Sequence, residues 1–282
     1  MRKVIVSLCL LVIAVCSLNA QTAYRLSYLF QYKRSVDGGY RSQDMMLDYD
    51  GKTAFFYEEN RFLKDSLAVL AFDETGSIKD NDAYGKAYDI RASVGIASLH
   101  DFSSHEMVHY YTSVAYFKGT MPSVMPEWEL KDERKEISGY DCRLAECSFL
   151  GRRWSVWYTE SMPVPVGPWL LWGAPGAVVQ ASDEDKLFIF KLHYAEKAGV
   201  SRIGKWNEYE DIISSRPNRV SYNYPMKEME RVHTKYERDR EFFSSVHGIT
   251  GGYNVNTRTG AHEEIPTTSP YIPLIPDEYW KQ

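Results

Sequence analysis

Between Trp128 and Asp183, aromatic strand-forming residues meet glycine–proline turns, and this stretch constrains the fold more than any other part of the chain. Its densest part reads Gly151-Arg152-Arg153-Trp154-Ser155-Val156-Trp157-Tyr158-Thr159, then Gly167-Pro168-Trp169, then Gly173-Ala174-Pro175-Gly176. β-Branched and aromatic residues favour strands, and proline interrupts regular structure between them. The stretch therefore predicts strands joined by stiff turns, and it places no obvious catalytic group among them.

The first 20 residues are typical of a signal peptide. Arg2 and Lys3 precede an apolar run, and Ala20 is a small residue at a suitable cleavage position. The run is shorter than the roughly 20 residues that span a bilayer as a helix. We therefore predict cleavage after Ala20 and export to the periplasm or outside the cell. A lipid anchor at Cys16 is the alternative, although Val15 stands where a small residue is expected.

Cleavage would leave 262 residues (282 − 20), with 31 Lys and Arg (33 − 2) against 38 Asp and Glu, a net charge of −7. This balance gives no footprint for nucleic acid, and no later segment is apolar enough to span a membrane. The 21 Tyr and seven Trp favour strands with half-exposed aromatic faces. We expect residues 21–282 to form a single β-rich domain.

Cys142 and Cys147 are the two cysteines that remain after cleavage. They lie five residues apart in a predicted strand, where an extended step of about 16 Å exceeds the reach of a disulfide. We predict two half-buried thiols and no bridge, unless the strand breaks at Ala145-Glu146.

The remaining pattern predicts a mainly β fold, a single antiparallel curved sheet or half-barrel meander with one or two helices. Turn residues at 36–39, 50–52 and 182–185 predict hairpins. Residues 61–72 could form a helix. The strongest helix pattern covers 225–243, with Met226, Met229 and Tyr236 on an inner face. The charged residues expected on its solvated face are Glu228, Glu230, Arg231, Lys235, Arg238 and Arg240. The tail from Gly248 is expected to form an extended arm or an edge.

His105-Glu106-Met107-Val108-His109 matches H-E-x-x-H, the most specific catalytic pattern in the chain. On a helix, the two histidines would bind zinc and Glu106 would activate the metal-bound water. The residues from Val108 onward are β-branched and aromatic, however, and favour a strand. A strand would place His105 and His109 about 13 Å apart, too far for one ion. A zinc-dependent hydrolase is therefore the alternative hypothesis, and helix or strand at this segment decides it.

Aromatic residues of the Trp128–Asp183 stretch are the candidates for a ligand or partner surface. Trp154 and Trp157 fall on opposite faces of one predicted strand, so one is expected in the core and the other is free to stack. We select Trp157, Trp169 and Trp172 as contact residues. Arg152 is added because a guanidinium can hold a carboxylate or phosphate, although a structural role for it is also open.

The same stretch resembles the GLPGLI family of exported Bacteroidetes proteins. The resemblance rests on Trp128-Glu129-Leu130, Lys135 to Cys142, Gly151-Arg152, Val156 to Thr159, Met162-Pro163, Gly167-Pro168 and Gly173-Ala174-Pro175-Gly176. The name-giving hexapeptide departs at Ala174 and at Ala177-Val178. The resemblance implies a signal peptide, one mostly antiparallel β domain and no assigned enzymatic activity. It also suggests a likeness to the curved half-barrels of LolA-type carriers.

These observations favour an exported envelope protein that binds an apolar ligand or an envelope protein without performing chemistry. They indicate no cofactor.

Overall fold

The computed structural model describes residues 23–73, 75, 77–91, 95–112, 115–198, 202–214, 221–246, 253–255, 262–264, 268 and 270–281. The predicted signal peptide and the alternative anchor at Cys16 lie outside the described residues.

Twelve strands of the described chain form one open sheet, in the order β12-β6-β5-β4-β3-β2-β1-β11-β10-β9-β8-β7. Every neighbouring pair is antiparallel except β12 and β6. The prediction of a mainly β fold built on one antiparallel sheet is therefore confirmed. The strands are β1 (Ala23–Tyr32), β2 (Arg41–Tyr49), β3 (Thr53–Glu58), β4 (Gly95–Asp101), β5 (Glu106–Thr112), β6 (Tyr116–Pro122), β7 (Glu129–Ile137), β8 (Tyr140–Phe149), β9 (Arg152–Thr159), β10 (Ala177–Asp183), β11 (Phe188–Ala198) and β12 (Ser221–Pro225).

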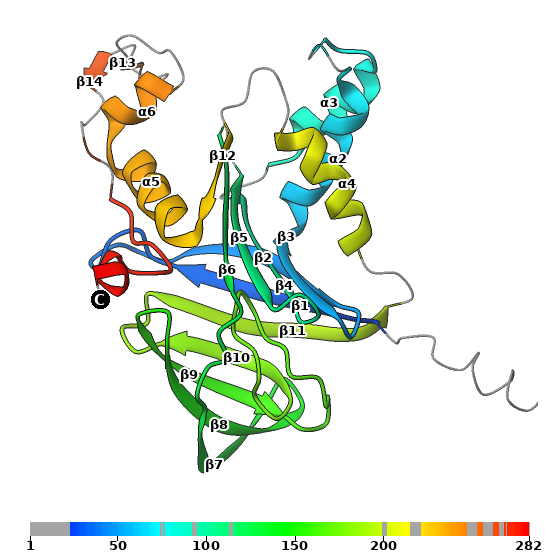
Figure 1. Cartoon of the computed structure of the whole chain (residues 1–282), viewed down its shortest axis with the longest axis vertical. Coiled ribbons are helices and arrows are strands. Elements are labelled where there is room, and N and C mark those ends of the chain that lie inside the picture. The colour runs from blue at the N-terminus through cyan, green and yellow to red at the C-terminus, as the bar shows by residue number, and fades with distance from the viewer. Residues whose placement is uncertain are drawn as a thin grey trace, which may run out of the picture.

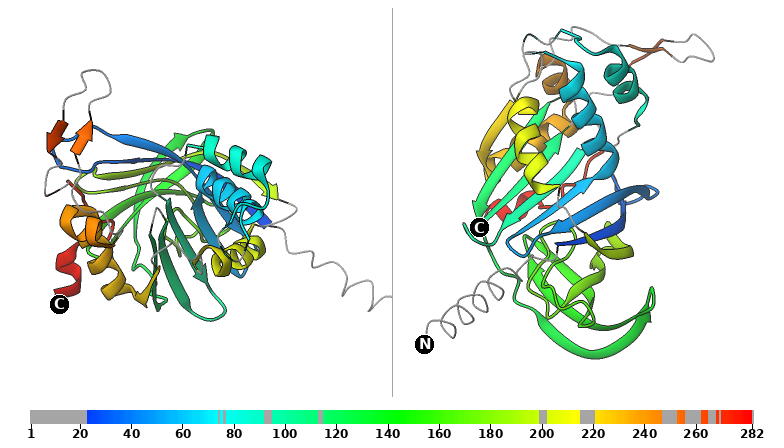
Figure 2. Two further views of the ribbon diagram at one scale, coloured as in Figure 1. Left: turned by 90° about the horizontal axis from the view of Figure 1, so that it is seen from above. Right: turned by 90° about the vertical axis from the view of Figure 1, so that its right-hand side faces the viewer.

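The sheet consists of two meanders joined by the first strand. β1 pairs with β2 on one side and with β11 on the other, so the β1–β6 meander continues directly into β11–β7. The predicted hairpins at 36–39, 50–52 and 182–185 are all present between antiparallel neighbours. Figures 1 and 2 show β7–β11 curling beneath the β1–β6 meander, which we call the upper meander, so the sheet is strongly curved.

Five helices of the described chain cover the upper meander: α2 (Glu59–Ala71), α3 (Asn81–Asp89), α4 (Ile203–Ser214), α5 (Met226–Arg238) and α6 (Arg240–Val246). In Figure 1, α5 and α6 stand on one side of it and α2, α3 and α4 on the other. The expectation of one or two helices was too low, because α3 is short, α4 is weakly patterned, and the last predicted helix divides into α5 and α6. The predicted 225–243 helix is two helices that break at Asp239, whose backbone bridges to Thr268.

The core alternates along β9 as the sequence predicts. Trp154, Val156 and Tyr158 are completely buried, while Trp157 points to the opposite face and is half-buried. Trp154 packs against Phe190 of β11, with ring centroids 6.2 Å apart. Cys142 and Cys147 are buried, free thiols in the unbroken strand β8. Burial raises the pKa of these thiols to about 11 and about 12, respectively.

The segment between β9 and β10, residues 160–176, fills the interior of the curved sheet. Trp169 contacts Trp154 of β9, and its carbonyl oxygen accepts a hydrogen bond from Ser98 of β4 at 2.9 Å. Because β4 and β9 are far apart in the strand order, this contact requires the sheet to curve around the segment. The chain enters β10 through a close approach of Gly176 to Thr159. Only glycine fits there, because a Cβ at position 176 would lie 2.0 Å from the carbonyl oxygen of Thr159.

The end of the chain forms an ordered arm, residues 270–281, that ends in the 3-10 helix η1 (Asp277–Lys281). Leu274 and Ile275 are buried in the main core. Figure 1 shows the arm running between α5 and the lower strands. Residues 270–276 of the arm form neither helix nor strand. A separate hairpin of β13 (Tyr253–Val255) and β14 (His262–Glu264) precedes the arm.

Candidate functional site

The H-E-x-x-H segment is a turn and a strand, so the zinc hypothesis is wrong in its geometry. Glu106 opens β5, and His105 lies in the preceding turn with a φ of 56°. His105 and Glu106 are exposed, whereas His109 is completely buried. The three extended steps from Glu106 to His109 span about 10 Å, and one zinc ion needs ligand bonds near 2 Å. Among the described residues, no group of three His, Cys, Asp or Glu side chains could hold a metal ion.

His109 instead belongs to a buried polar network with α5. Its Nδ1 lies 2.8 Å from Oε1 of Glu230, and both side chains are at most 2% exposed. The hydroxyl of Tyr111 donates to both carboxylate oxygens of Glu230 at 3.2 Å. The prediction that Glu230 faces solvent is therefore wrong. Met226 and Met229, which flank it, were assigned correctly to the inner face, and this neighbourhood could have indicated a buried carboxylate.

The network continues from the core toward the surface. The rings of Tyr111 and His233 stack at 3.5 Å, and Nδ1 of His233 lies 3.3 Å from the hydroxyl of Tyr271 in the arm. Arg34, in the β1–β2 turn, then contacts Glu237 at 3.1 Å and the carbonyl oxygen of Pro270 at 3.0 Å. Burial lowers the pKa of His233 well below its ordinary value. The network therefore connects β5, α5, the first hairpin and the arm.

Arg152 is directed inward and holds the arm. Its side chain is 8% exposed and donates to the carbonyl oxygens of Pro273 (2.7 Å) and Leu274 (2.8 Å). It also forms an ion pair with Asp183 at 3.2 Å and lies over the ring of Phe188. These contacts match the structural role that the sequence left open. A ligand would reach this guanidinium only by displacing the arm.

The three selected tryptophans lie in separate environments. Trp169 is 3% exposed and packs against Trp154, Phe149 and His109 in the core. Trp157 lies on the other face of β9, beneath the ammonium group of Lys135 at 4.5 Å. Trp172 is half-buried, next to His100 and the segment that joins β6 to β7.

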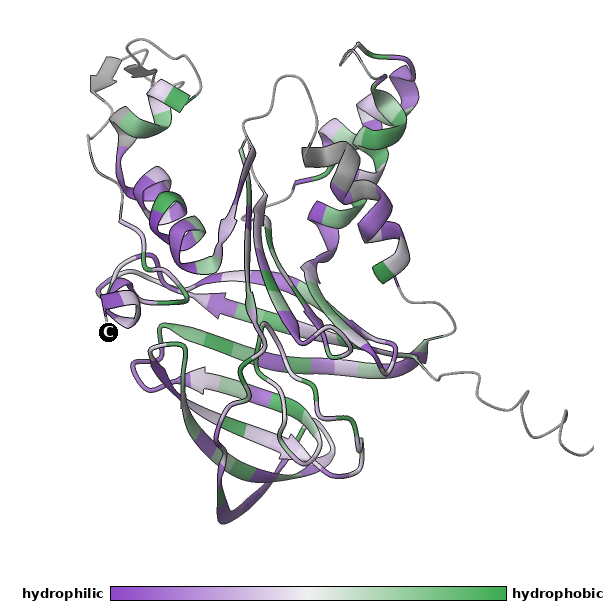
Figure 3. Cartoon of the chain, in the orientation of Figure 1, coloured by the Kyte–Doolittle hydropathy of each residue, from purple (hydrophilic) through white to green (hydrophobic). Residues whose placement is uncertain are grey.

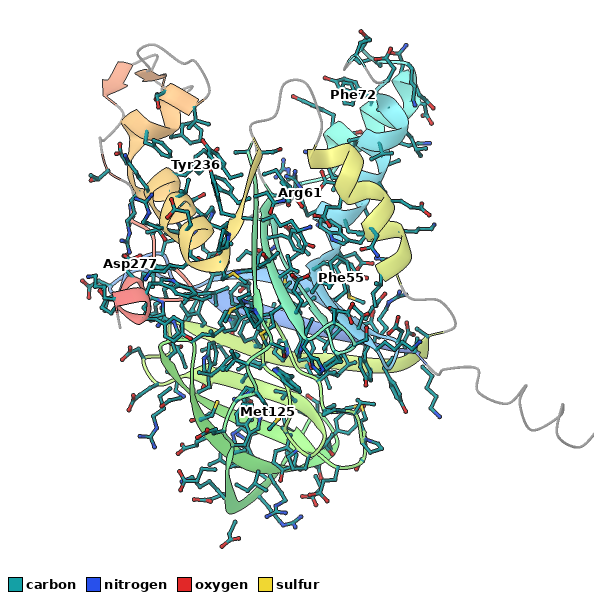
Figure 4. The ribbon with its side chains drawn as sticks, in the orientation of Figure 1. Phe55, Arg61, Phe72, Met125, Tyr236 and Asp277 are labelled. Carbon is teal, nitrogen blue, oxygen red and sulfur yellow. The ribbon has the colours of Figure 1, made fainter. Side chains whose placement is uncertain are left out.

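Trp172 supports one wall of an open groove. Its indole N–H donates to the carbonyl oxygen of Val124 at 3.0 Å, and the indole N–H of Trp128 donates to the carbonyl oxygen of Trp172 at 2.8 Å. Met125 follows Val124 and is 60% exposed; its side chain would lie only 3.2 Å from a Cβ at Gly173. The glycine at position 173 thus lets the 123–128 segment pack against the 160–176 segment. Figure 4 labels Met125 over the lower strands.

The groove has a volume of about 540 Å³, and we call it the Met125 groove. Its apolar surface comes from Val124, Met125, Phe149, Leu150 and Tyr279, the last of these from η1. Its rim carries three carboxylates and one guanidinium, those of Glu127, Glu129, Glu146 and Arg153. The size lies within the range of about 300–1,000 Å³ that is typical of small-molecule sites. Its apolar side chains and its excess of carboxylates suit an uncharged or weakly cationic ligand with an apolar part.

No protein-family model matches the sequence, and no curated protein matches it. Among solved structures, PNGF-II has 14% sequence identity and a TM-score of 0.43 over 68% of this chain. This chain spans only 33% of the length of PNGF-II. A LolA superfamily protein from Nitrosomonas europaea has 7% identity and a TM-score of 0.26, covering 64% of this chain and 89% of that protein.

A putative outer membrane lipoprotein-sorting protein domain from Vibrio parahaemolyticus has 8% identity and a TM-score of 0.28, covering 70% of this chain and 93% of that domain. Across the described part of the chain, no helix is both long enough and apolar enough to cross a membrane.

Proposed function

We propose that this chain is an exported envelope protein of the GLPGLI type that binds an apolar ligand, without chemistry, in the Met125 groove. The observation that carries the proposal is a partly apolar groove whose wall is anchored by Trp172 and whose edge is an exposed methionine. Export rests on the signal-peptide pattern of residues 1–20. Membership of the family rests on the motifs between Trp128 and Gly176.

Three properties of the groove favour binding of an apolar molecule. Met125 is flexible and polarisable, so it can adapt its shape to a ligand. Trp172 is fixed by two indole hydrogen bonds, which keeps the adjacent wall in place. Phe149 and Leu150 are already buried in the core, so the floor of the groove is rigid.

An apolar segment of an envelope protein is the second candidate occupant. Val124, Met125 and Leu130 are 42%, 60% and 48% exposed along one short stretch of chain, which is a feature of interaction surfaces. Pairing through the adjacent sheet edge is disfavoured, because β7 is a strongly charged edge strand. A protein partner would therefore have to enter the groove.

Binding of an uncharged fluorescent apolar probe, N-phenyl-1-naphthylamine, tests the proposal. The wild-type chain is expected to bind the probe saturably, with enhanced fluorescence. Met125→Asp should weaken binding about tenfold or more, because it places a charge in an apolar site. The matched control is Val36→Asp, since Val36 is 68% exposed in the distant β1–β2 turn.

Equal affinity of Met125→Asp and wild type would reject the groove as the site, and absence of saturable binding would reject the apolar ligand. If the probe does not bind but Met125→Asp abolishes capture of an identified envelope protein, the protein-partner version is supported instead.

A further inference from the structure

A second groove lies on the other side of η1, between the arm and the outer face of α5, and we call it the α5 groove. It has a volume of about 720 Å³ and is lined by Pro225, one face of α5, Asp239, and Asp277, Trp280 and Lys281 of η1. Tyr279 lines the Met125 groove and Trp280 lines the α5 groove, so adjacent residues of η1 separate the two. Figure 4 labels Asp277 beside α5.

The helix contributes one continuous stripe to this groove. Lys227, Arg231, Thr234 and Arg238 recur at intervals of four, three and four residues, which places them on one helix face. Figure 3 shows the outer part of α5 as mostly hydrophilic. Long basic side chains expose aliphatic stems along such a stripe and carry their charges at its edge. The stems, Pro225 and the Trp280 ring therefore give apolar walls beneath a cationic rim.

The charges around the α5 groove are unbalanced. Its lining has five cationic and three anionic side chains. Two of the carboxylates are already engaged, Glu228 with Arg231 and Asp277 with Arg238 at 2.8 Å. The third, Asp239, accepts the backbone N–H of Phe242 at 3.0 Å. In the described part of the chain, no ion pair joins Lys227, Lys235 or Lys281 to a carboxylate.

The groove also covers polar groups that lack partners. Thr234 is 5% exposed, and its hydroxyl has no hydrogen-bond partner among the described residues. The indole N–H of Trp280 is likewise shielded from water and unpaired within the described chain. An unpaired buried donor is unfavourable by about 1–3 kcal/mol. A ligand with acceptor oxygens would relieve this cost after a small movement of the Trp280 ring.

We propose that the α5 groove binds an anionic amphiphile, a molecule with a single carboxylate or phosphate head and an apolar chain. The excess positive charge attracts the anionic head group of the ligand. The aliphatic stems of the basic side chains and the Trp280 ring contact its alkyl tail. The Met125 groove has the opposite charge balance, with three carboxylates against one guanidinium. The two grooves therefore discriminate by charge, and this second site does not depend on the function proposed for the first.

The probe for this site is sodium dodecanoate below its micelle concentration, titrated calorimetrically into the full chain. Dodecyltrimethylammonium, with the same chain length and opposite charge, is the matched ligand. We expect saturable binding of dodecanoate that weakens as salt is added. The double variant Arg231→Glu/Lys235→Glu should weaken it about tenfold or more, because attraction becomes repulsion. Trp280→Ala should also weaken it.

Two controls locate the site. Arg134→Glu changes an exposed arginine of β7, ion-paired with Asp141, that is absent from the groove lining; it should leave the affinity unchanged. Met125→Asp should also leave dodecanoate binding intact. If Met125→Asp abolishes dodecanoate binding and the double variant retains it, the ligand binds in the Met125 groove and the proposal is overturned. Equal binding of the cationic amphiphile, or no saturable binding of dodecanoate, would also overturn it.

Discussion

At the scale of single residues, the contact between His109 and Glu230 shows how a motif can mislead. His109 belongs to a sequence pattern with a well-known zinc chemistry, yet its backbone is extended and its imidazole is paired with a carboxylate 121 residues away. Burial makes this pair sensitive to the loss of either partner, because the remaining polar group cannot reach water.

Glu230→Ala is expected to lower the free energy of unfolding by about 3–5 kcal/mol, since it leaves His109 and the Tyr111 hydroxyl without their shared acceptor. Urea unfolding monitored by circular dichroism measures the change. Glu228→Ala, on the exposed face of the same helix, should change stability by less than about 1 kcal/mol. Equal effects of the two substitutions would mean that the buried network is not needed for the folded state.

His100, which contacts Trp172 beside the Met125 groove, makes the stability of the fold depend on pH. Its Nε2 lies 2.7 Å from the hydroxyl of Ser123, and its ring packs against Trp172 and Phe102. Burial lowers its pKa from the ordinary 6.5 to about 4. Below pH 6.5 the unfolded chain binds a proton at His100 that the folded protein refuses until about pH 4. His100 therefore makes the fold less stable as the pH falls through this window.

His100→Gln removes the titrating group and retains a partner for Ser123. We expect the variant to lose less stability than wild type when the pH falls from about 6.5 to about 4. The measurement is the difference in unfolding free energy between the two ends of that range. His193→Gln, at an exposed position of β11, is the control. A slope identical to that of wild type in His100→Gln would contradict the assignment.

At the scale of elements, the arm stabilises the fold by bridging parts that the sheet leaves apart. Through Tyr271 it reaches α5, and through Arg152 it reaches the start of β9 and the end of β10. Arg238 of α5 also donates to the carbonyl oxygen of Tyr271 at 3.2 Å. The arm is therefore part of the core, although its sequence is rich in proline.

Arg152→Ala should destabilise the protein by about 3–5 kcal/mol, because Asp183 loses its cationic partner and two buried carbonyl oxygens lose their donor. Limited proteolysis should also cut the arm earlier than in wild type. The neighbouring Arg153 is an exposed residue paired with Glu146, and Arg153→Ala should cost less than about 1 kcal/mol. An arm that stays resistant to protease in Arg152→Ala would refute its role as the anchor.

At the scale of the whole molecule, the pairing of β1 with β11 makes two meanders into one cooperative unit. Trp169 adds a second connection, since it contacts His109 in the first meander and Trp154 in the second. Groups of strands that share a core are expected to unfold together.

A single unfolding transition is therefore expected, with far-ultraviolet circular dichroism and tryptophan fluorescence changing together. Glu230→Ala in the first half and Arg152→Ala in the second half should both shift this one transition. Two separated transitions, with each variant moving only one of them, would instead show that the meanders are independent.

The strands and turns of this protein were largely predictable, because they follow from local chemistry. Alternation along β9 placed Trp154 and Trp157 on opposite faces, and the hairpin turns were set by glycine and aspartate. The Met226–Met229–Tyr236 face of α5 was also clear from its spacing. The groove residues Val124 and Met125 were missed, because they lie in a proline-flanked segment with no periodic pattern.

The sequence by itself determined most of the antiparallel strands and their turns, since these depend on neighbouring residues. It favoured a strand at His105–His109 without deciding it, and the structure decided it. Only the tertiary structure decided that Glu230 is buried, that Trp169 lies in the core and that Arg152 holds the arm. Each of these residues has partners more than 30 positions away. The physical reason is that burial and pairing are properties of a folded surface, and no local pattern specifies which distant surface will cover a side chain.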